Sequence, residues 1–332
     1  MAETRRPTVA AAEEILGGYF PVLDHGFVAL VDYMGSDEDI ERAARVSYGF
    51  GTRKVSQTRG LIRYLRRHRH TTPSEMVELK FHVCMPIFVA RQWIRHRTAN
   101  VNEYSGRYSL MPLLFYTPDR WHFALQSEDN KQGRRTDEAD PGLYAEAVSR
   151  WEALRKEAGD GYGWLVENEV ARELARIDLP LSTYTQWYWK IDLHNLIHFL
   201  ALRVDPHAQY EIRAFAEVMA GILKRVAPLS YEAWVDYEFA GATLSRGEVE
   251  ALRRLVEVRR GEDGVALSAR AGASLDPAAL KAAGLSGREV LELAEKLEER
   301  SVPDFELDPA RMRSPEEMAA KMEEAVPKLE LD

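Results

Sequence analysis

The fold is indicated first by residues 77–86, which read VELKFHVCMP. Apolar side chains stand at every second position from Val77 to Met85, and mostly polar ones lie between them. This period of two is typical of a β-strand with one buried face. Pro86 ends the strand and can start a helix, which we expect to run to about Arg95.

Other strands and helices are predicted on both sides of this strand. Strand-like runs cover residues 26–34, 107–111 and 181–190. Residues 72–75, TPSE, read as a capping box with proline at the first helical position. Helices are expected to end near Arg45 and to cover residues 10–16, 61–69, 141–158, 164–177, 192–203, 207–226, 246–259, 277–283 and 286–299.

The order of these elements predicts the fold class. Strands and helices alternate without a regular βαβ rhythm, so we predict an α+β fold with a mixed or antiparallel sheet flanked by helices. No G-x-G-x-x-G sequence follows a strand, which argues against a Rossmann fold. We expect an N-terminal extension at residues 1–24, a single main domain at 25–230, and a charged, partly helical C-terminal extension at 231–332.

Composition limits the classes of protein to consider. The chain has 332 residues, 45% of them hydrophobic, and a net charge of -9 from 44 basic and 53 acidic residues. That balance disfavours a nucleic-acid partner, while local arginine clusters suit small phosphorylated ligands. Only one cysteine is present, and no apolar run has the roughly 20 residues that span a bilayer. We therefore expect a cytoplasmic protein without a membrane partner.

The most informative stretch for chemistry is residues 91–107, RQWIRHRTANVNEYSGR. It carries four arginines, a histidine and a glutamate across a helix end and the following loop. Arginine offers a planar fork of donors that suits phosphate and the carbonyl edge of a pyrimidine. A solvated, salt-bridged helix end is the plain alternative, but the loop with its Ser105-Gly106-Arg107 sequence favours a ligand site.

Arg95-His96-Arg97, followed by Ser105 after seven residues, resembles the signature of the flavin-dependent thymidylate synthases. The resemblance covers about residues 24–230, because other segments are similar to the family in the same order. These segments are GFVALVD at 26–32, AARVS at 43–47, HTTP at 70–73, ARQW at 90–93, ARIDLPL at 175–181 and LRVDPHAQ at 202–209.

This resemblance implies that residues 25–230 convert dUMP to dTMP. Methylenetetrahydrofolate would donate the carbon, NADPH would reduce bound FAD, the flavin would pass hydride to the pyrimidine, and tetrahydrofolate would be released. Family members are homotetramers, which implies that residues 95–107 meet Arg176 and Arg203 across a subunit boundary. The alternative is a non-catalytic nucleotide-binding protein that keeps the arginines around the phosphate.

The resemblance also implies roles for individual residues. Arg203 is similar to the family arginine beside the uracil ring, where a fixed cation would stabilise negative charge on N3 and O2. The implied dUMP contacts are Gln92, Trp93, Ile94, Arg95, Glu103, Tyr104, Ser105, Gly106, Arg107, Arg176 and Arg203. The implied FAD contacts are Ser47, His70, Thr72, Arg95, His96, Arg97, Glu103, Asp192, Leu193, His194 and His198. Asp192, His194 and His198 differ from the asparagine, arginine and asparagine that members can carry there.

The sequence also suggests two alternatives, a cysteine nucleophile and a metal site. Cys84 lies inside the predicted strand without an adjacent base, so we do not expect it to act as a nucleophile. His194 and His198 have the i, i+4 spacing that can hold a metal on one helix face. They lack the glutamate of an H-E-x-x-H pair, and we expect no metal.

Overall fold

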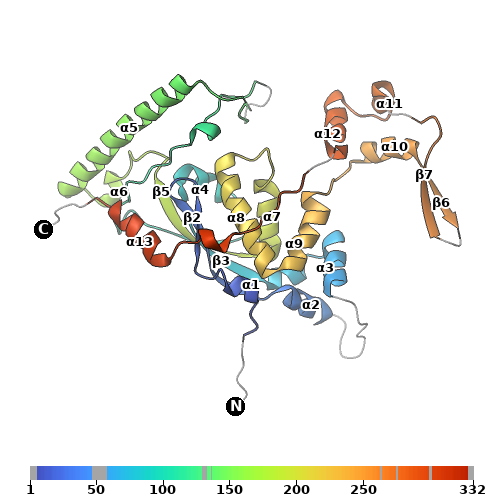
Figure 1. Cartoon of the computed structure of the whole chain (residues 1–332), viewed down its shortest axis with the longest axis horizontal. Coiled ribbons are helices and arrows are strands. Elements are labelled where there is room, and N and C mark those ends of the chain that lie inside the picture. Colours follow the sequence, from blue (N-terminus) through green and yellow to red (C-terminus); the bar gives the residue numbers. More distant parts are fainter. Residues whose placement is uncertain are drawn as a thin grey trace, which may run out of the picture. The chain divides into compact units, whose positions relative to one another are not determined.

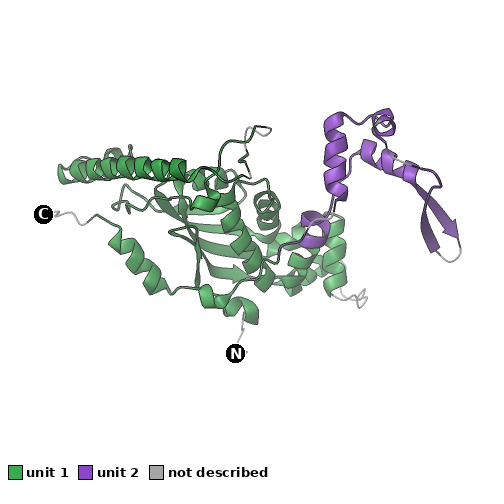
Figure 2. Ribbon diagram, turned by 45° about the horizontal axis from the view of Figure 1, so that its top comes forward, with its two compact units in different colours: residues 1–234, 304–332 green, residues 235–303 purple. Residues whose placement is uncertain are grey.

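A computed structural model describes residues 6–46, 58–128, 133–135, 137–261, 264–273, 276–298 and 301–327 of the chain. Contacts between Cα atoms divide the chain into two compact units (Figure 2). The first unit comprises residues 1–234 and 304–332, and the second comprises residues 235–303.

The first unit is built on a five-stranded sheet in the order β1-β2-β3-β5-β4, and each neighbouring pair is antiparallel (Figure 1). The α+β prediction with an antiparallel sheet is therefore confirmed. Three strands lie where alternation predicted them, with shifts of up to three residues at their ends. The strands are β1 (Tyr19–Val22), β2 (Gly26–Met34), β3 (Glu78–Pro86), β4 (Asn100–Glu103) and β5 (Tyr184–Asp192).

The central strand β3 buries the face that its alternation indicated. Leu79, Phe81 and Val83 are fully buried, and Phe81 stands opposite Trp189 of β5. On the other face, the His82 ring stacks on Tyr188 with 4.8 Å between centroids. Burying an aliphatic or aromatic side chain of this size stabilises the fold by about 1.5–3 kcal/mol.

Helices cover the buried face of the sheet through one aromatic cluster. Trp93 is fully buried at the centre, with Trp187, Trp189, Phe199 and Phe215 within 4.9–6.1 Å between ring centroids. These rings come from strand β5 and three different helices, so the cluster fixes the helices on the sheet. The helices that supply it are α4 (Ile87–Trp93), α7 (Leu193–Arg203) and α8 (Tyr210–Val226).

The remaining helices of the first unit pack around this core. Asp37, at the start of α2, accepts hydrogen bonds from the amides of Leu229 and Ser230 and so caps α9. These helices are α1 (Ala10–Glu13), α2 (Asp37–Val46), α3 (Thr58–Arg67), η1 (Thr72–Met76), η2 (Arg120–His122), α5 (Pro141–Glu167), α6 (Arg172–Ala175), α9 (Pro228–Trp234), η4 (Pro309–Arg311) and α13 (Pro315–Glu324).

Two predictions in this unit are wrong for identifiable reasons. The helices expected at 141–158 and 164–177 are one helix, α5, followed by the short α6, because the three glycines near position 161 do not break it. Gly159 suits its place, since a Cβ there would lie 3.2 Å from Leu113. Residues 107–111 form a turn instead of a strand, and the strand is β4, a short segment whose four residues are all exposed and include only one apolar side chain, Val101.

The C-terminal segment packs on the first unit. Arg313 forms an antiparallel bridge with Tyr19, and Met318 of α13 packs in a cluster that includes Phe27, Cys84 and Tyr184. Cys84 is fully buried there, although Lys80 and His82 on the same face of β3 are partly exposed. Residues 304–327 therefore contribute to the core of the first unit.

The second unit contains a small core of its own, formed by Ala251, Leu280, Leu285 and Leu293. The helix expected over 246–259 ends at Leu255, and a hairpin follows that the sequence did not predict. The elements are η3 (Val235–Phe239), α10 (Arg246–Leu255), β6 (Val256–Gly261), β7 (Gly264–Ala269), α11 (Pro277–Ala282) and α12 (Gly287–Leu297). Across the described part of the chain, no helix is long and apolar enough to cross a membrane.

Candidate functional site

The arginine-rich segment begins at the last turn of α4. Trp93 is fully buried, so its indole ring is not open to a ligand. The buried ring holds α4 against the sheet, and the next residues project from it: Ile94 is 39% exposed, and Arg95 and Arg97 are exposed. His96 turns back toward α7, where its ring meets Phe199 edge-on at 4.9 Å.

His96 and Arg203 form a direct polar contact. Arg203 Nε donates to His96 Nε2 over 3.0 Å, and the His198 ring lies 6.1 Å from the His96 ring. Burial, then Arg203, then His198 lower the pKa of His96 from 6.5 to about 4. Because a guanidinium only donates, the His96 Nε2 atom accepts and the ring proton sits on Nδ1. Arg203 is thus a fixed cation at the end of α7, as the sequence predicted for its position.

A cavity of about 490 Å³ opens where β4 ends. Glu103, Tyr104, Ser105 and Arg176 line it, and all four were predicted to contact dUMP. Pairing with β5 positions them, since the Tyr104 amide donates to the Gln186 carbonyl over 2.9 Å. The Thr185 hydroxyl, also in the wall, donates to Glu103 Oε1 over 2.7 Å.

Gly106 is buried behind Ser105, where a side chain has no room. A Cβ there would lie 2.6 Å from Met111 Sδ and 3.2 Å from Arg176 Cδ. Arg107 is exposed and pairs with Glu173, with 3.3 Å between Nε and Oε2. The turn therefore carries Arg107 and packs against Arg176.

Some of the residues expected to meet across a subunit boundary also meet within one chain. Arg203 bonds to His96, and Arg176 lies against Gly106. The expected contact of residues 95–107 with Arg176 and Arg203 across a subunit boundary stays a prediction.

The residues predicted to bind FAD lie mainly around η1 and α7. Thr72 begins η1, and the exposed His70 stacks on Tyr64 at 6.0 Å. The predicted capping box is wrong: η1 has no side-chain cap, and the Thr71 hydroxyl bonds to Glu75 Oε1 over 3.1 Å. Ser47 lies outside the described residues.

At the N-terminus of α7, some side chains cap the helix or pack in the core, and others are free to contact a ligand. Asp192 caps the helix by accepting from the Asn195 amide over 2.9 Å, and Leu193 is fully buried. The His194 Nδ1 atom is buried and has no hydrogen-bond partner among the described residues. His198 is exposed. His194 is therefore the member of this group that most needs an additional polar partner.

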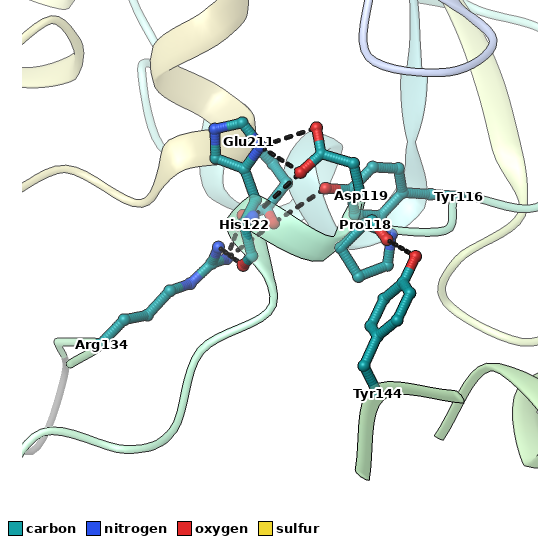
Figure 3. A network of polar contacts seen from close by, with 7 residues as sticks. All are labelled: Tyr116, Pro118, Asp119, His122, Arg134, Tyr144 and Glu211. Atoms are coloured by element: carbon teal, nitrogen blue, oxygen red, sulfur yellow. Dashed lines mark hydrogen bonds and ion pairs between the residues drawn. The ribbon is translucent and has the colours of Figure 1, made fainter. Parts of the chain in front are cut away.

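A hydrogen-bond chain behind Gln92 was not predicted. Gln92 Nε2 donates to Gln209 Oε1, and Gln209 Nε2 donates to Glu211 Oε2 over 2.8 Å. Glu211 also pairs with Arg134 and accepts from Tyr116 (Figure 3). The sequence contained one sign of it, since Gln209 closes the family-like segment 202–209.

Two further observations bear on ligands. A larger cavity of about 650 Å³ lies along α5 and contains none of the predicted site residues. Within the ranges that the structure describes, no group of three or more histidine, cysteine, aspartate or glutamate side chains is arranged to hold a metal ion.

Comparison with known proteins gives a consistent result. The family model described as "Thymidylate synthase complementing protein" matches residues 29–229. A flavin-dependent thymidylate synthase of Gluconobacter oxydans is 57% identical over 257 residues, covering 76% of this chain and 84% of the relative. The corresponding protein of Wolbachia pipientis is 54% identical over 255 residues, covering 76% of this chain and 89% of the relative.

Solved structures agree with these sequence matches. A UMP/dUMP methylase, PolB, from Streptomyces cacaoi bound with 5-Br dUMP is 35% identical, with a TM-score of 0.58 over 64% of this chain and 96% of that one. Both the fold and the order of the polar segments thus match enzymes of one kind. The chain belongs to the flavin-dependent thymidylate synthase family.

Proposed function

We propose that this enzyme methylates dUMP to dTMP at the cavity beside β4. The observation that carries the proposal is the convergence of Glu103, Tyr104, Ser105 and Arg176 on that cavity. Arginine, a hydroxyl and close backbone amides are the groups that hold a phosphate. The relatives named above support the choice of a pyrimidine nucleotide.

The proposed dUMP site divides into a phosphate end and a base end. Ser105, Gly106, Arg107 and Arg176 would hold the phosphate, with Glu103 and Tyr104 beside the sugar. Gln92, Ile94, Arg95 and Arg203, together with the backbone of Trp93, would contact the rest of the nucleotide. The crowding at Gly106 supports this division, because the missing side chain lets Arg176 lie directly against the turn that carries Ser105.

Arg203 is the proposed catalytic residue. Methyl transfer to the uracil ring requires negative charge to spread into the ring carbonyls. A guanidinium held by His96 and partly buried at the end of α7 is oriented before the reaction begins. Such preorganised charge stabilises a transition state more than the ground state.

The described residues around α7 fit an FAD group. The buried His194 Nδ1 atom lacks a partner, and the exposed Arg95, Arg97, His70 and Thr72 offer donors for a diphosphate or a polar ring. We propose that FAD binds to Ser47, His70, Thr72, Arg95, His96, Arg97, Glu103, Asp192, Leu193, His194 and His198. Leu193 could contribute only backbone, and Asp192 already caps α7. When bound, the reduced flavin supplies the hydride that completes the methyl group.

The remaining parts of the proposal concern co-substrates and assembly. Methylenetetrahydrofolate would supply the carbon and NADPH the reducing equivalents, so that dUMP, the folate, NADPH and a proton give dTMP, tetrahydrofolate and NADP⁺. We also propose a homotetramer in the cytoplasm that needs no nucleic acid or membrane partner. The competing function, supported by the phosphate-binding arginines alone, is non-catalytic nucleotide binding.

One assay separates these functions. The purified protein is incubated with dUMP, FAD, NADPH and methylenetetrahydrofolate, and both dTMP and the folate product are quantified. We expect dTMP and tetrahydrofolate in equal amounts, and no dTMP when either NADPH or FAD is withheld. Dihydrofolate as the product, or dTMP without a reductant, would contradict the mechanism. Binding of dUMP without turnover would favour the nucleotide-binding alternative.

A further inference from the structure

The hydrogen-bond chain behind Gln92 starts from a buried carboxylate. Glu211 is 2% exposed, and its Oε1 accepts from Arg134 over 2.6 Å and from Tyr116 over 3.1 Å (Figure 3). Burial alone would raise the pKa of Glu211, but the hydrogen bonds from Arg134 and Gln209 outweigh it and the pKa lies below the usual value. Glu211 is therefore ionised and can only accept hydrogen bonds.

An acceptor at one end gives the whole chain a direction. Glu211 Oε2 requires a donor from Gln209, so the amide nitrogen of Gln209 faces it over 2.8 Å. The carbonyl oxygen of Gln209 then points to Gln92 and requires a donor in turn. Gln92 donates this hydrogen bond from Nε2, which leaves its Oε1 without a hydrogen-bond partner among the described residues. Reversing either amide would set two acceptors against each other.

We propose that Glu211 and Gln209 are positioning residues that make Gln92 present an acceptor, Oε1, to dUMP. This inference rests on the proposed function, since it requires that Gln92 contacts the nucleotide. The dUMP molecule has two donors that fit, the N3–H of the base and the 3′-hydroxyl of the sugar. Glu211, which sets the direction, is thus three hydrogen bonds away from the ligand.

The same logic predicts what one isosteric change does. In Glu211→Gln the new amide can turn either atom toward Gln209, because Arg134 donates to both oxygens of Glu211 and the Tyr116 hydroxyl can accept as well as donate. When the nitrogen of residue 211 faces Gln209, Gln209 turns its oxygen to residue 211 and its nitrogen to Gln92. Gln92 in turn offers Nε2 to the ligand, and two donors face each other. The double variant Gln209→Glu with Glu211→Gln removes the conflict, because the carboxylate at 209 again accepts from Gln92.

The test measures dissociation constants for dUMP by calorimetry with the FAD-loaded enzyme. We expect Glu211→Gln to weaken dUMP binding about threefold, or ~0.7 kcal/mol, because only part of the molecules then present Gln92 Oε1 to the ligand. The double variant should bind dUMP within about 1.5-fold of wild type, because the carboxylate at 209 fixes the direction of Gln92 again. Should Glu211→Gln fail to fold, Gln209→Met replaces it, with an expected loss of about threefold. Equal binding by wild type and these single variants would overturn the proposal.

Two dUMP analogues identify the donor, one methylated at N3 and one lacking the 3′-hydroxyl. The analogue without the relevant donor should bind wild type and Glu211→Gln equally, and a full difference with both analogues would overturn the proposal.

Tyr116→Phe is the matched control, because it removes one contact of Glu211 but keeps an ionised acceptor. It should leave dUMP affinity within about twofold; a loss as large as that of Glu211→Gln would mean that packing, not direction, matters. Wild type that binds no dUMP would instead refute the proposed function.

Discussion

Replacing Arg203 with alanine tests the assignment of chemistry to the end of α7. The change removes the cation that lies 3.0 Å from His96 Nε2 and that would face the uracil ring. Loss of one preorganised donor to developing negative charge typically costs about 10²–10³ in turnover. We expect a fall of about 100-fold in the rate of dTMP formation at saturating dUMP, with bound FAD nearly unchanged.

The structure also predicts a spectroscopic effect of this substitution. Three causes lower the pKa of His96 from 6.5 to about 4: burial is the largest, followed by Arg203 and His198. Removing Arg203 takes away one of these causes, so the pKa of His96 should rise but stay below 6.5, because burial and His198 remain. The direction is upward, because a neighbouring cation disfavours the protonated ring.

The free energy of unfolding should follow the same linkage. In wild type, His96 stays neutral in the folded state between pH 6.5 and about pH 4, while the unfolded chain takes up a proton. The stability that the neutral folded His96 gives relative to the unfolded chain is fully present above pH 6.5 and is lost as the pH falls toward 4. In Arg203→Ala the folded pKa is higher, so the loss should span a narrower range of pH.

Three measurements check these expectations together. Rapid mixing gives the rate of dTMP formation, flavin absorbance gives FAD content, and NMR of labelled histidine gives the pKa of His96. Arg203→Lys should recover little activity, because an ammonium does not reproduce the planar fork. Arg246→Ala is the control, since Arg246 is 91% exposed. Near-normal turnover by Arg203→Ala would show that Arg203 only orders its own helix end.

Three other substitutions have defined outcomes. Cys84→Ala should keep turnover within about twofold, because Cys84 is fully buried and burial raises its pKa; a thousandfold loss would revive a thiol nucleophile. Gly106→Ala should weaken dUMP binding more than tenfold, while Gly60→Ala, where a Cβ meets nothing within 4 Å, should not; equal effects in calorimetry would refute the crowding argument. Met318→Asp should lower the free energy of unfolding by about 3 kcal/mol in urea titration, and an unchanged midpoint would mean that α13 contributes nothing to the core.

The core of the fold was predictable because its burial leaves a pattern in the sequence. Strand β3 alternates along its length, and α7 and α8 carry apolar stripes with clear ends, so each was located to within about three residues. Strand β4 has no such pattern, because all four of its residues are exposed at the edge of the sheet. The hairpin β6–β7 is likewise exposed along most of its length. The first residues of β6 continue the helical pattern of α10, so the hairpin is evident only from the pairing of its two strands.

The sequence supports a proposed set of site residues, but it does not predict the contacts between them. Resemblance identified Arg203 and His96 separately, and no local pattern relates two positions 107 residues apart. Gln209 belongs to a recognised segment, yet its contact with Gln92 depends on how α4 and α8 pack on one sheet. Glu211 looked like an ordinary acidic residue in the first turn of a helix, and only its 2% exposure distinguishes it.

Helix α7 relates the two proposed ligand sites to each other. Its first turn, capped by Asp192, carries His194, and its last residue, Arg203, bonds to His96. Eleven residues at 1.5 Å each give a rod of roughly 16 Å between these ends. Buried side chains fix this rod on the sheet, including Phe199 against Trp93, so neither end can move alone. The proposed flavin contact His194 and the proposed pyrimidine contact Arg203 are therefore held on one packed helix, which suits a reaction whose partners must keep a fixed geometry.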